Sequence, residues 1–381
     1  DGIRDAQESR GLGDVYKRQA EYHDKDNKIH YDQSIMSRVY LDWNATAPLR
    51  LEVRAAIINA MDVTGNPSSV HGEGRIAKGL IERARLQLAE SFGCDPNGII
   101  WTSSATEAAG LMMQSNNLNC AKIEHDCVKA HGTTDLFINA NGIVKAAGNF
   151  ALQGANSETG ICQGDQVRGA VMSDQVQTFG KLPISFNWLD VKSALLSAHK
   201  IGGPKGVGAL VLSDGIDVSA QIKGGGQEQG RRSGTENLLG IVGFGAAAKI
   251  AAQDLANGVW EQVAELRDKM EIRIADTATD AIFFGKDVDR LPNTSNFAVP
   301  GWKGETQVMK MDLSGFAISA GSACSSGKVK VSQVLKAMGY DDTTASSAIR
   351  VSIGPTTTEQ DVMNFADAWI KAYKKFVAKA A

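Results

Sequence analysis

The sequence predicts an α/β fold in which buried strands alternate with helices. Short apolar runs such as Ser193–Leu196 and Ala209–Leu212 are typical of buried strands. The strand-like run Gly98–Thr102 is followed by Ser104 and, three residues later, Glu107, which is the capping-box pattern of a helix start. The chain has 381 residues, more than one small core accommodates, so we expect two domains.

Lys200 lies at a glycine-rich turn, Ser197–Gly208, between the two strand-like runs. An amine at such a turn is both fixed and reachable. It becomes a nucleophile toward a carbonyl when its pKa is lowered by desolvation or by a neighbouring cation, and His199 and the close-packed glycine backbone offer such a setting. The natural carbonyl partner is pyridoxal phosphate. A glycine-rich hairpin with a solvated lysine is the alternative that this stretch alone leaves open.

The composition is that of an ordinary globular protein, with 43% hydrophobic residues, 22% charged residues and a net charge of −3. This charge balance does not favour a nucleic-acid or membrane surface, so the partner should be a small molecule or another protein. The sequence shows no apolar stretch approaching the roughly 20 residues of a membrane span. It also shows no signal peptide, so we expect a cytoplasmic location.

The cysteine pattern argues against a disulfide framework and against a zinc site, because the number is odd and no C-x-x-C pair occurs. At least one thiol is therefore expected to be free. The five cysteines are Cys94, Cys120, Cys127, Cys162 and Cys324.

The first part of the chain is expected to be a disordered tail, because residues 1 to about 35 are polar and show neither the helical nor the strand periodicity of apolar residues. Its opening looks like read-through from sequencing or cloning, and Met36 is a sensible initiator. From Met36 onward we expect a strand at Val39–Trp43, a turn at Asn44–Pro48 and a helix at about Leu51–Met61.

A second helix should be amphipathic and should end at Gly93. Its apolar face should carry Ile76, Leu80, Ile81, Ala84 and Leu88.

The helix start after Gly98–Thr102 is a candidate phosphate seat. Free backbone N–H groups and the helix dipole favour an anion there, and the hydroxyls of Ser103, Ser104 and Thr106 surround the position. An ordinary helix cap is the simpler alternative.

Asp174, at the end of the buried-looking strand Gly169–Asp174, is a second candidate, with Gln177 close behind it. In an α/β sheet, ligands gather at the carboxyl ends of strands. A helix-capping aspartate is the commoner role. A single histidine such as His125 is likewise more often a satisfied surface or core residue than a catalyst.

The second half of the chain begins with a glycine-rich loop that leads to Ser233 and Glu236, a second S-x-x-E pattern. This pattern should open a helical tract, broken by glycines, that runs to about Ala275 and is suited to bridging two domains. Short strands should follow around Ser295–Val299 and Phe316–Ser319.

The chain should close with a strand over Ala348–Ile353 that carries Arg350 and with a helix that begins at Thr356 and Glu359. The buried residues of that helix should be Val362, Phe365, Trp369 and Phe376.

Cys324 lies in Gly321–Lys328, which superficially resembles a P-loop. Five residues separate its glycines and Val329 stands where a Ser or Thr belongs, so we exclude a nucleotide site. A thiol flanked by Ser and Gly is expected to be exposed and mobile, unlike a buried structural cysteine.

Together these motifs resemble those of cysteine desulfurases, which are pyridoxal-phosphate enzymes of the class-V aminotransferase family. The resemblance extends from about Met36 to the C-terminus. Seven stretches occur in the family's order: Tyr40–Thr46, Gly65–Ser68, Ser104–Glu107, Glu124–His125, Ser197–Gly206, Arg232–Thr235 and Ser322–Cys324.

The resemblance implies the fold-type I architecture and a homodimer. A large α/β domain over residues 51–250 would hold a mostly parallel seven-stranded sheet. A smaller α+β domain over residues 36–50 and 251–381 would carry the loop with the catalytic cysteine.

The resemblance also implies roles in holding the cofactor. Lys200 would bind it covalently, Asp174 would pair with its pyridinium nitrogen, and Gln177 would contact its phenolic oxygen. His125 would stack on the ring and move protons, with Asn156 and Ser157 near the ring. The phosphate would be held by Ala105, Thr106, Ser197 and His199, and by Thr235 of the other subunit.

For the substrate L-cysteine, the resemblance implies that Arg350, with Asn156, binds the carboxylate. The Cys324 thiolate would take the sulfur as a persulfide, alanine would leave, and the sulfur would pass to an acceptor such as an iron–sulfur scaffold. No metal is implied.

Two departures from the family pattern bear on the site. Many members have two adjacent asparagines where this chain has Asn156 and Ser157, so the usual amide contact to the ring is weakened or served by Ser157. The stretch between Thr106 and Asp174 is shorter than usual, which predicts the loss of peripheral helices.

Other functions remain open. The alternatives are a selenocysteine lyase, another class-V aminotransferase-like enzyme, or a degenerate fold that acts as a scaffold.

Overall fold

The structure is a computed structural model that describes residues 38–114, 116–321 and 331–380. The described residues from Tyr40 onward form one compact unit. The tail expected at residues 1 to 35 and the predicted nucleophile Cys324 lie outside the described residues. The division into a large and a small domain stays a prediction.

The central sheet has five hydrogen-bonded strands, in the spatial order β2 (Ile99–Thr102), β9 (Gly208–Leu212), β8 (Ser193–Ser197), β7 (Met172–Asp174) and β6 (Ala151–Gln153). A parallel bridge between Asn119 and Phe150 extends it. The added strands are β3 (Asn119–Ala121) and β4 (Thr133–Ile138), and the short β5 (Val144–Lys145) pairs with β4.

Apart from the short β5, which is antiparallel to β4, β9 alone among these strands runs against the rest. It is antiparallel to both β2 and β8, whereas β8, β7 and β6 are mutually parallel and β3 is parallel to β4. The predicted mostly parallel sheet is confirmed, but its continuous part among the described residues has five strands, and β3 and β4 join it only through the single bridge from Asn119 to Phe150.

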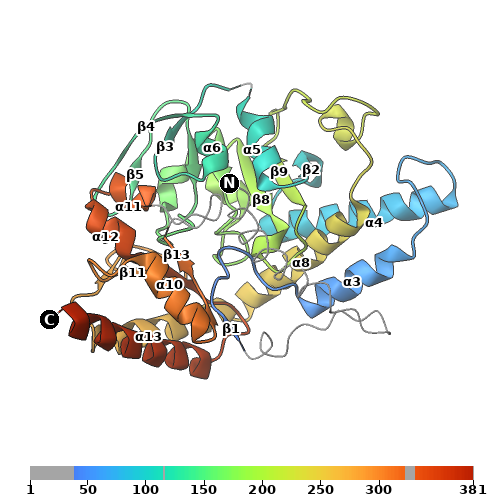
Figure 1. The fold of residues 1–381 in the computed structure, drawn as a ribbon. Helices are drawn as coiled ribbons and strands as arrows, with labels where there is room; N and C mark the ends of the chain where they lie inside the picture. The colour runs from blue at the N-terminus through green and yellow to red at the C-terminus, as the bar shows by residue number, and fades with distance from the viewer. Residues whose placement is uncertain (1–37, 115, 322–330, 381) are drawn as a thin grey trace, which may run out of the picture. The chain divides into compact units, whose positions relative to one another are not determined.

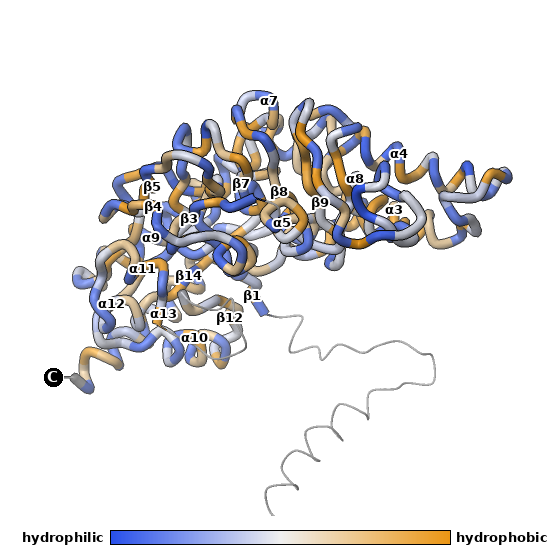
Figure 2. Tube along the Cα trace, turned by 90° about the horizontal axis from the view of Figure 1, so that it is seen from above, coloured by the Kyte–Doolittle hydropathy of each residue, from blue (hydrophilic) through white to orange (hydrophobic). Residues whose placement is uncertain are grey.

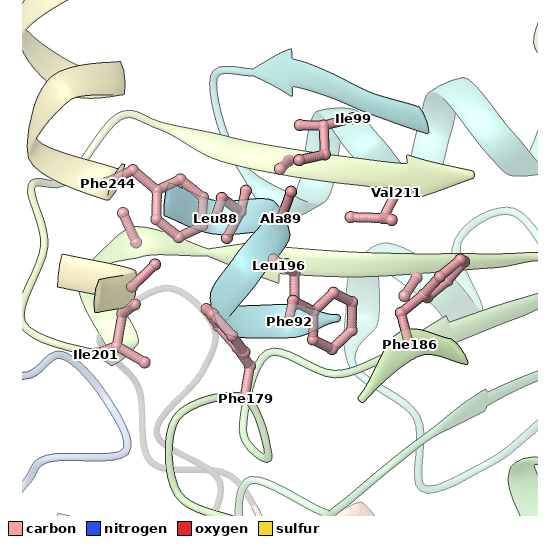
Figure 3. Packing of buried hydrophobic residues seen from close by; sticks show 14 of the residues in the cluster. Leu88, Ala89, Phe92, Ile99, Phe179, Phe186, Leu196, Ile201, Val211 and Phe244 are labelled. Atoms are coloured by element: carbon pink, nitrogen blue, oxygen red, sulfur yellow. The ribbon is translucent and has the colours of Figure 1, made fainter. Parts of the chain in front are cut away.

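Both faces of the sheet are buried, because successive residues of a strand point to opposite sides. On one face, Ile99, Leu196 and Val211 pack with helices α4 (Gly72–Phe92) and α8 (Leu238–Ala256), as Figure 3 shows. On the other face, their chain neighbours pack with helix α5 (Ala105–Met113); these are Ile100, Leu195 and Leu210. The apolar runs of β2, β8 and β9 therefore lack polar alternation, because neither face of these strands meets water.

Helix α8 lies beside α3 (Leu51–Met61) and α4, as Figure 1 shows. By length and composition alone, α8 is the one helix in the described part of the chain that could cross a membrane. Our expectation that no apolar stretch approaches that length was therefore wrong. The core helix of a globular protein passes the same test, and α8 buries Ile241, Phe244 and Ala248 in the core. Figure 2 shows hydrophobic stretches along α8 and β9.

A second, antiparallel sheet has the order β10 (Ile282–Phe283), β11 (Thr294–Ala298), β14 (Ala348–Ser352) and β13 (Ser319–Ala320). Helices α10 (Gly304–Leu313) and α13 (Glu359–Ala380) lie beside it in Figure 1. The α9 helix (Val259–Ala275) packs on both α13 and β11.

The remaining elements are short. They are β1 (Val39–Tyr40), β12 (Phe316–Ala317), α6 (Asp126–Lys129), α7 (Phe186–Leu189), α11 (Gln333–Ala337), α12 (Asp342–Ser347) and the 3₁₀ turns η1 (Pro96–Gly98), η2 (Gly164–Val167), η3 (Ala198–Lys200) and η4 (Glu228–Gly230).

Two predicted helix starts are wrong by a few residues. The α8 helix is capped by Asn237, whose Oδ1 accepts the N–H of Gly240 at 3.1 Å, and not by Ser233. The α13 helix starts at a reciprocal pair in which Thr358 N–H donates to Asp361 Oδ2 at 2.9 Å and Asp361 N–H donates to Thr358 Oγ1 at 3.2 Å. In each case an equally good capping residue two to four positions further along competes successfully with the predicted one.

Two predicted core residues also differ. Ile76 is 59% exposed, and its neighbour Ala77 is buried in its place. Phe376 is half-buried near the end of α13, where its ring stacks on Trp302 at a centroid distance of 5.2 Å.

Candidate active site

A cavity of about 350 Å³ lies at the carboxyl ends of β7 and β8, within the size range of small-molecule sites. It brings together nine of the residues that the sequence predicted to bind a cofactor. These are Ala105, Thr106, His125, Ser157, Asp174, Gln177, Ser197, His199 and Lys200.

Lys200 reaches the cavity because β8 ends at Ser197 and the η3 turn follows directly. Its Nζ donates to the carbonyl oxygens of Asn44 at 2.6 Å and Ala45 at 2.9 Å. Lys200 therefore lies at a fixed place on the cavity wall, at the turn that the sequence predicted.

Asn44 is itself held from several sides. Its N–H donates to Ser352 Oγ at 3.0 Å, and its Nδ2 donates to Thr294 Oγ1 at 2.8 Å. Only 1% of the residue is exposed. The carbonyl that accepts from Lys200 is thus fixed by strands β11 and β14, which come from the second sheet.

His199 is uncharged at neutral pH. Burial, together with the cations Lys200 and Lys205, lowers its pKa to about 4. Its Nδ1 lies 3.1 Å from Thr46 Oγ1. His199 therefore does not supply the neighbouring cation that we expected beside Lys200.

The N-terminus of α5 forms one wall of the cavity. Ser104 caps the helix, its Oγ accepting the N–H of Glu107 at 3.2 Å, as the capping-box pattern predicts. The N–H groups of Ala105 and Thr106 are the first of the helix, where no intrahelical acceptor exists. With the Thr106 hydroxyl, they make this wall suited to an anion.

Gly208 allows this helix start to lie close to β9. A Cβ at Gly208 would stand 2.5 Å from the carbonyl carbon of Ser104 and 2.7 Å from the nitrogen of Ala105. Both atoms belong to the backbone and cannot rotate away. A side chain here would displace the anion-binding wall.

Asp174 ends β7, and its Oδ1 accepts the N–H of Val176 at 2.9 Å. Burial raises the pKa of this carboxyl, while His125 and Lys200 act in the opposite direction. A carboxylate so placed is suited to a cationic group inside the cavity.

His125 caps the short helix α6, and its Nδ1 accepts the N–H of Cys127 at 3.2 Å. The same nitrogen lies 3.0 Å from Cys127 Sγ. Burial raises the pKa of the Cys127 thiol to about 12, so this cysteine is not a nucleophile at neutral pH.

Two of the remaining predicted residues do not line the cavity. The side chain of Asn156 is engaged in its own loop, where Nδ2 donates to Ile123 O at 2.9 Å and Oδ1 accepts the N–H of Thr159 at 2.9 Å. Thr235 lines a different cavity of about 190 Å³, near Arg232.

Arg350 is 3% exposed and reaches the loop behind the cavity. Its two terminal nitrogens donate to Ser157 O at 3.0 Å and to Asp42 Oδ1 at 2.7 Å. Its Nε is buried without a hydrogen-bond partner among the described atoms. The role of Arg350 toward a substrate stays a prediction.

Sequence reasoning missed several residues of the cavity wall, among them Asn44, Ala45, Cys127 and Gln153. Asn44 and Ala45 belong to the motif Tyr40–Thr46, and Cys127 follows His125 by two positions. Those two motifs were the sequence signals that could have identified these wall residues.

Three comparisons with known proteins agree on the family to which this chain is similar. The family model "Aminotransferase class-V" matches residues 39–133 and 119–365. The cysteine desulfurase IscS of Dictyoglomus turgidum is 34% identical over 361 residues, which is 85% of this chain and 91% of that protein. A cysteine desulfurase of Cereibacter sphaeroides is 35% identical over 365 residues, covering 86% of this chain and 93% of that protein.

Among solved structures, the NifS-like protein of Rickettsia africae matches with a TM-score of 0.80 and 32% identity, over 88% of this chain and 99% of that one. The residues that the family model matches include the strands of both sheets and the residues that line the cavity. The chain belongs to the cysteine desulfurases of the class-V aminotransferase family.

Proposed function

We propose that this chain is a pyridoxal-phosphate-dependent cysteine desulfurase that converts L-cysteine to L-alanine and keeps the sulfur as a cysteine persulfide. One observation carries the proposal. A single cavity contains an amine at Lys200, a carboxylate at Asp174 and an anion-binding helix start at Thr106.

The residues present fit pyridoxal phosphate. Its aldehyde matches the Lys200 amine, its ring nitrogen matches Asp174, and its phosphate matches the start of α5, where Gly208 leaves room for the close approach of backbone. Ser157 lines the cavity while Asn156 is turned into its loop, so Ser157 is the residue that faces the ring. When bound, the cofactor supplies an electron sink that stabilises negative charge on the substrate's α-carbon.

His125 is placed to move protons in this cavity. Its Nδ1 accepts a hydrogen bond from the backbone N–H of Cys127, so in the neutral ring the proton is on Nε2. The Nε of Arg350 is buried and has no hydrogen-bond partner among the residues that the structure describes, and we assign Arg350 to the substrate carboxylate.

The sulfur step belongs to Cys324. Its thiolate attacks the sulfur of the bound cysteine, and an S–S bond forms as the Cβ–S bond breaks. The bonding electron pair stays with the carbon fragment, which takes up a proton and leaves as alanine. A thiolate is required because a serine hydroxyl is almost fully protonated at neutral pH.

A homodimer completes the proposal. Thr235 lines a separate cavity from Lys200, which supports its donation to the phosphate of a partner subunit. Helices α3 and α4 and the segment between them carry apolar side chains that are at least half exposed, as an interface would require. They are Leu51 at 78%, Ile58 at 50%, Met61 at 63%, Val70 at 89% and Ile76 at 59%.

We further propose a cytoplasmic location and a protein acceptor for the persulfide sulfur, such as an iron–sulfur scaffold. A selenocysteine lyase would use the same cofactor residues, so the choice of substrate separates it from a desulfurase.

The test combines the wild type with two variants, each incubated with pyridoxal phosphate, L-cysteine and a reductant. The wild type should release sulfide and alanine in equal amounts. Cys324→Ser should still bind the cofactor and change colour with cysteine, but should release neither product. In the wild type, borohydride reduction should fix the covalent link between Lys200 and the cofactor. Lys200→Ala should not form this link.

Two results would contradict the proposal. If Cys324→Ser kept most of its sulfide release, another nucleophile would be at work. If Lys200→Ala still formed the borohydride-fixed link, the cofactor would be anchored elsewhere. Selenocysteine as a competing substrate tests the lyase alternative.

A further inference from the structure

Lys181 is a buried lysine next to the cavity that the proposed reaction does not use. It is 2% exposed and follows β7 by seven residues, beyond the cavity residue Gln177. Its Nζ donates to Gln177 Oε1 at 2.8 Å and to Asn44 Oδ1 at 3.3 Å. Both partners are neutral amides, which compensate poorly for the burial of an ammonium group.

The burial of Lys181 is energetically unfavourable. Desolvation, and the cations Lys200 and Arg350, lower the pKa of Lys181 well below its usual range. A buried lysine beside a ligand cavity is more often functional than one in an ordinary core.

Two neighbours fix the orientation of the Gln177 amide. The charged form of Lys181 can only donate, and its neutral form can still donate, so the amide oxygen of Gln177 suits the position that faces Lys181 Nζ. The carbonyl oxygen of Asn44 can only accept, so the atom that faces it, at 3.1 Å, must be the amide nitrogen. The two requirements agree, so the amide cannot flip without losing both hydrogen bonds.

This orientation decides what Gln177 offers to a ligand. The amide nitrogen has two N–H groups, and Asn44 O takes one of them. The other is left for the cavity that Gln177 lines. A flipped amide would instead present an acceptor.

We propose that Lys181 is a positioning residue that holds the Gln177 amide so that it donates a hydrogen bond into the cavity, to the phenolic oxygen of pyridoxal phosphate. This rests on the proposed function for the identity of the acceptor. Lys181 touches neither the cavity nor the reacting atoms and acts through Gln177.

A double-mutant cycle tests the proposal. The variants are Lys181→Met, which keeps an unbranched side chain but removes the amine, Gln177→Leu, and the two combined. Lys192→Met is the matched control, because Lys192 is an exposed lysine on the same part of the chain. Each protein is titrated with pyridoxal phosphate, and the dissociation constant and the visible absorption maximum are recorded.

Lys181→Met and Gln177→Leu should each weaken cofactor binding roughly fivefold, the loss expected for one hydrogen bond. Both should shift the absorption maximum in the same direction, since both remove the same donor from the phenolic oxygen. The double variant should match Gln177→Leu alone. Lys192→Met should match the wild type.

The proposal is overturned if Lys181→Met keeps the wild-type spectrum and affinity, or if the effects of the two substitutions on cofactor affinity are additive in the double variant. If Lys181→Met does not fold, the double variant should fold, because it removes both partners of the buried hydrogen bond. A double variant that fails while Gln177→Leu folds would also overturn it. A wild type without any visible cofactor band would instead refute the proposed function.

Discussion

Replacing Gly208 by alanine tests whether the close approach of β9 to the start of α5 builds the phosphate seat. The added Cβ would lie 2.5 Å from the carbonyl carbon of Ser104 and 2.7 Å from the nitrogen of Ala105. Ordinary contacts begin at 3.4 Å, so the helix start must move by about 1 Å in a tightly packed region. Overpacking of this kind lowers the free energy of unfolding by about 1–3 kcal/mol.

The same movement should weaken cofactor binding by about tenfold, because the N–H groups of Ala105 and Thr106 would no longer be aimed at the phosphate. Urea unfolding followed by circular dichroism measures the first effect, and a titration with pyridoxal phosphate measures the second. Gly79→Ala is the matched control. A Cβ there meets nothing within 4 Å on the exposed side of α4, so it should stabilise by about 0.5–1 kcal/mol. If Gly208→Ala behaved like Gly79→Ala in both measurements, the steric argument for the phosphate seat would be wrong.

Three further predictions concern groups outside this wall. Glu228→Ala should lower the free energy of unfolding by about 3 kcal/mol in urea titrations, because the buried Arg85 loses its buried partner at 3.0 Å and, of the carboxylates that the structure places beside it, keeps only the exposed one of Glu82 at 3.5 Å. Glu359→Ala breaks the exposed pair with Lys269 and should change the free energy of unfolding little. Equal effects of the two substitutions would contradict this difference between a buried and an exposed pair. Burial raises the pKa of Glu158 to about 7, so its contribution to stability is lost as the pH rises from about 4.5 through 7. Glu158→Gln should therefore gain stability relative to the wild type between about pH 5 and about pH 8, and a constant difference would count against the raised pKa. Finally, iodoacetamide at about pH 8 should leave Cys127 unmodified in peptide maps, given its pKa of about 12; rapid labelling would show that the thiol is accessible and ionised.

Local patterns predicted the fold well where the responsible interactions are local. The turn that carries Lys200 and the Ser104 cap follow from a few adjacent residues, and both are confirmed. Ile76 was mispredicted because it fits the apolar period of α4, yet this end of the helix extends beyond the core that would cover it.

The site was predicted less completely, because its missing parts depend on contacts between distant segments. Lys181 meets Asn44 across 137 positions in the chain, and no local pattern announces that pairing. Likewise, only the folded loop decides that Ser157 faces the cavity while Asn156 bonds to Ile123.

The attachment of Asn44 to Ser352 and Thr294 has a consequence for biosynthesis. The ribosome makes the Lys200 turn long before it makes strand β14, so a nascent chain of about half length has the amine but lacks the strands that fix Asn44. Domains tend to fold as units during synthesis, from the N-terminus onward. Here one wall of the cavity joins an early segment to one of the last, so cofactor loading must wait until translation of the catalytic unit is nearly finished. Chains arrested before β14 should accumulate without cofactor, whatever the supply of pyridoxal phosphate in the cell.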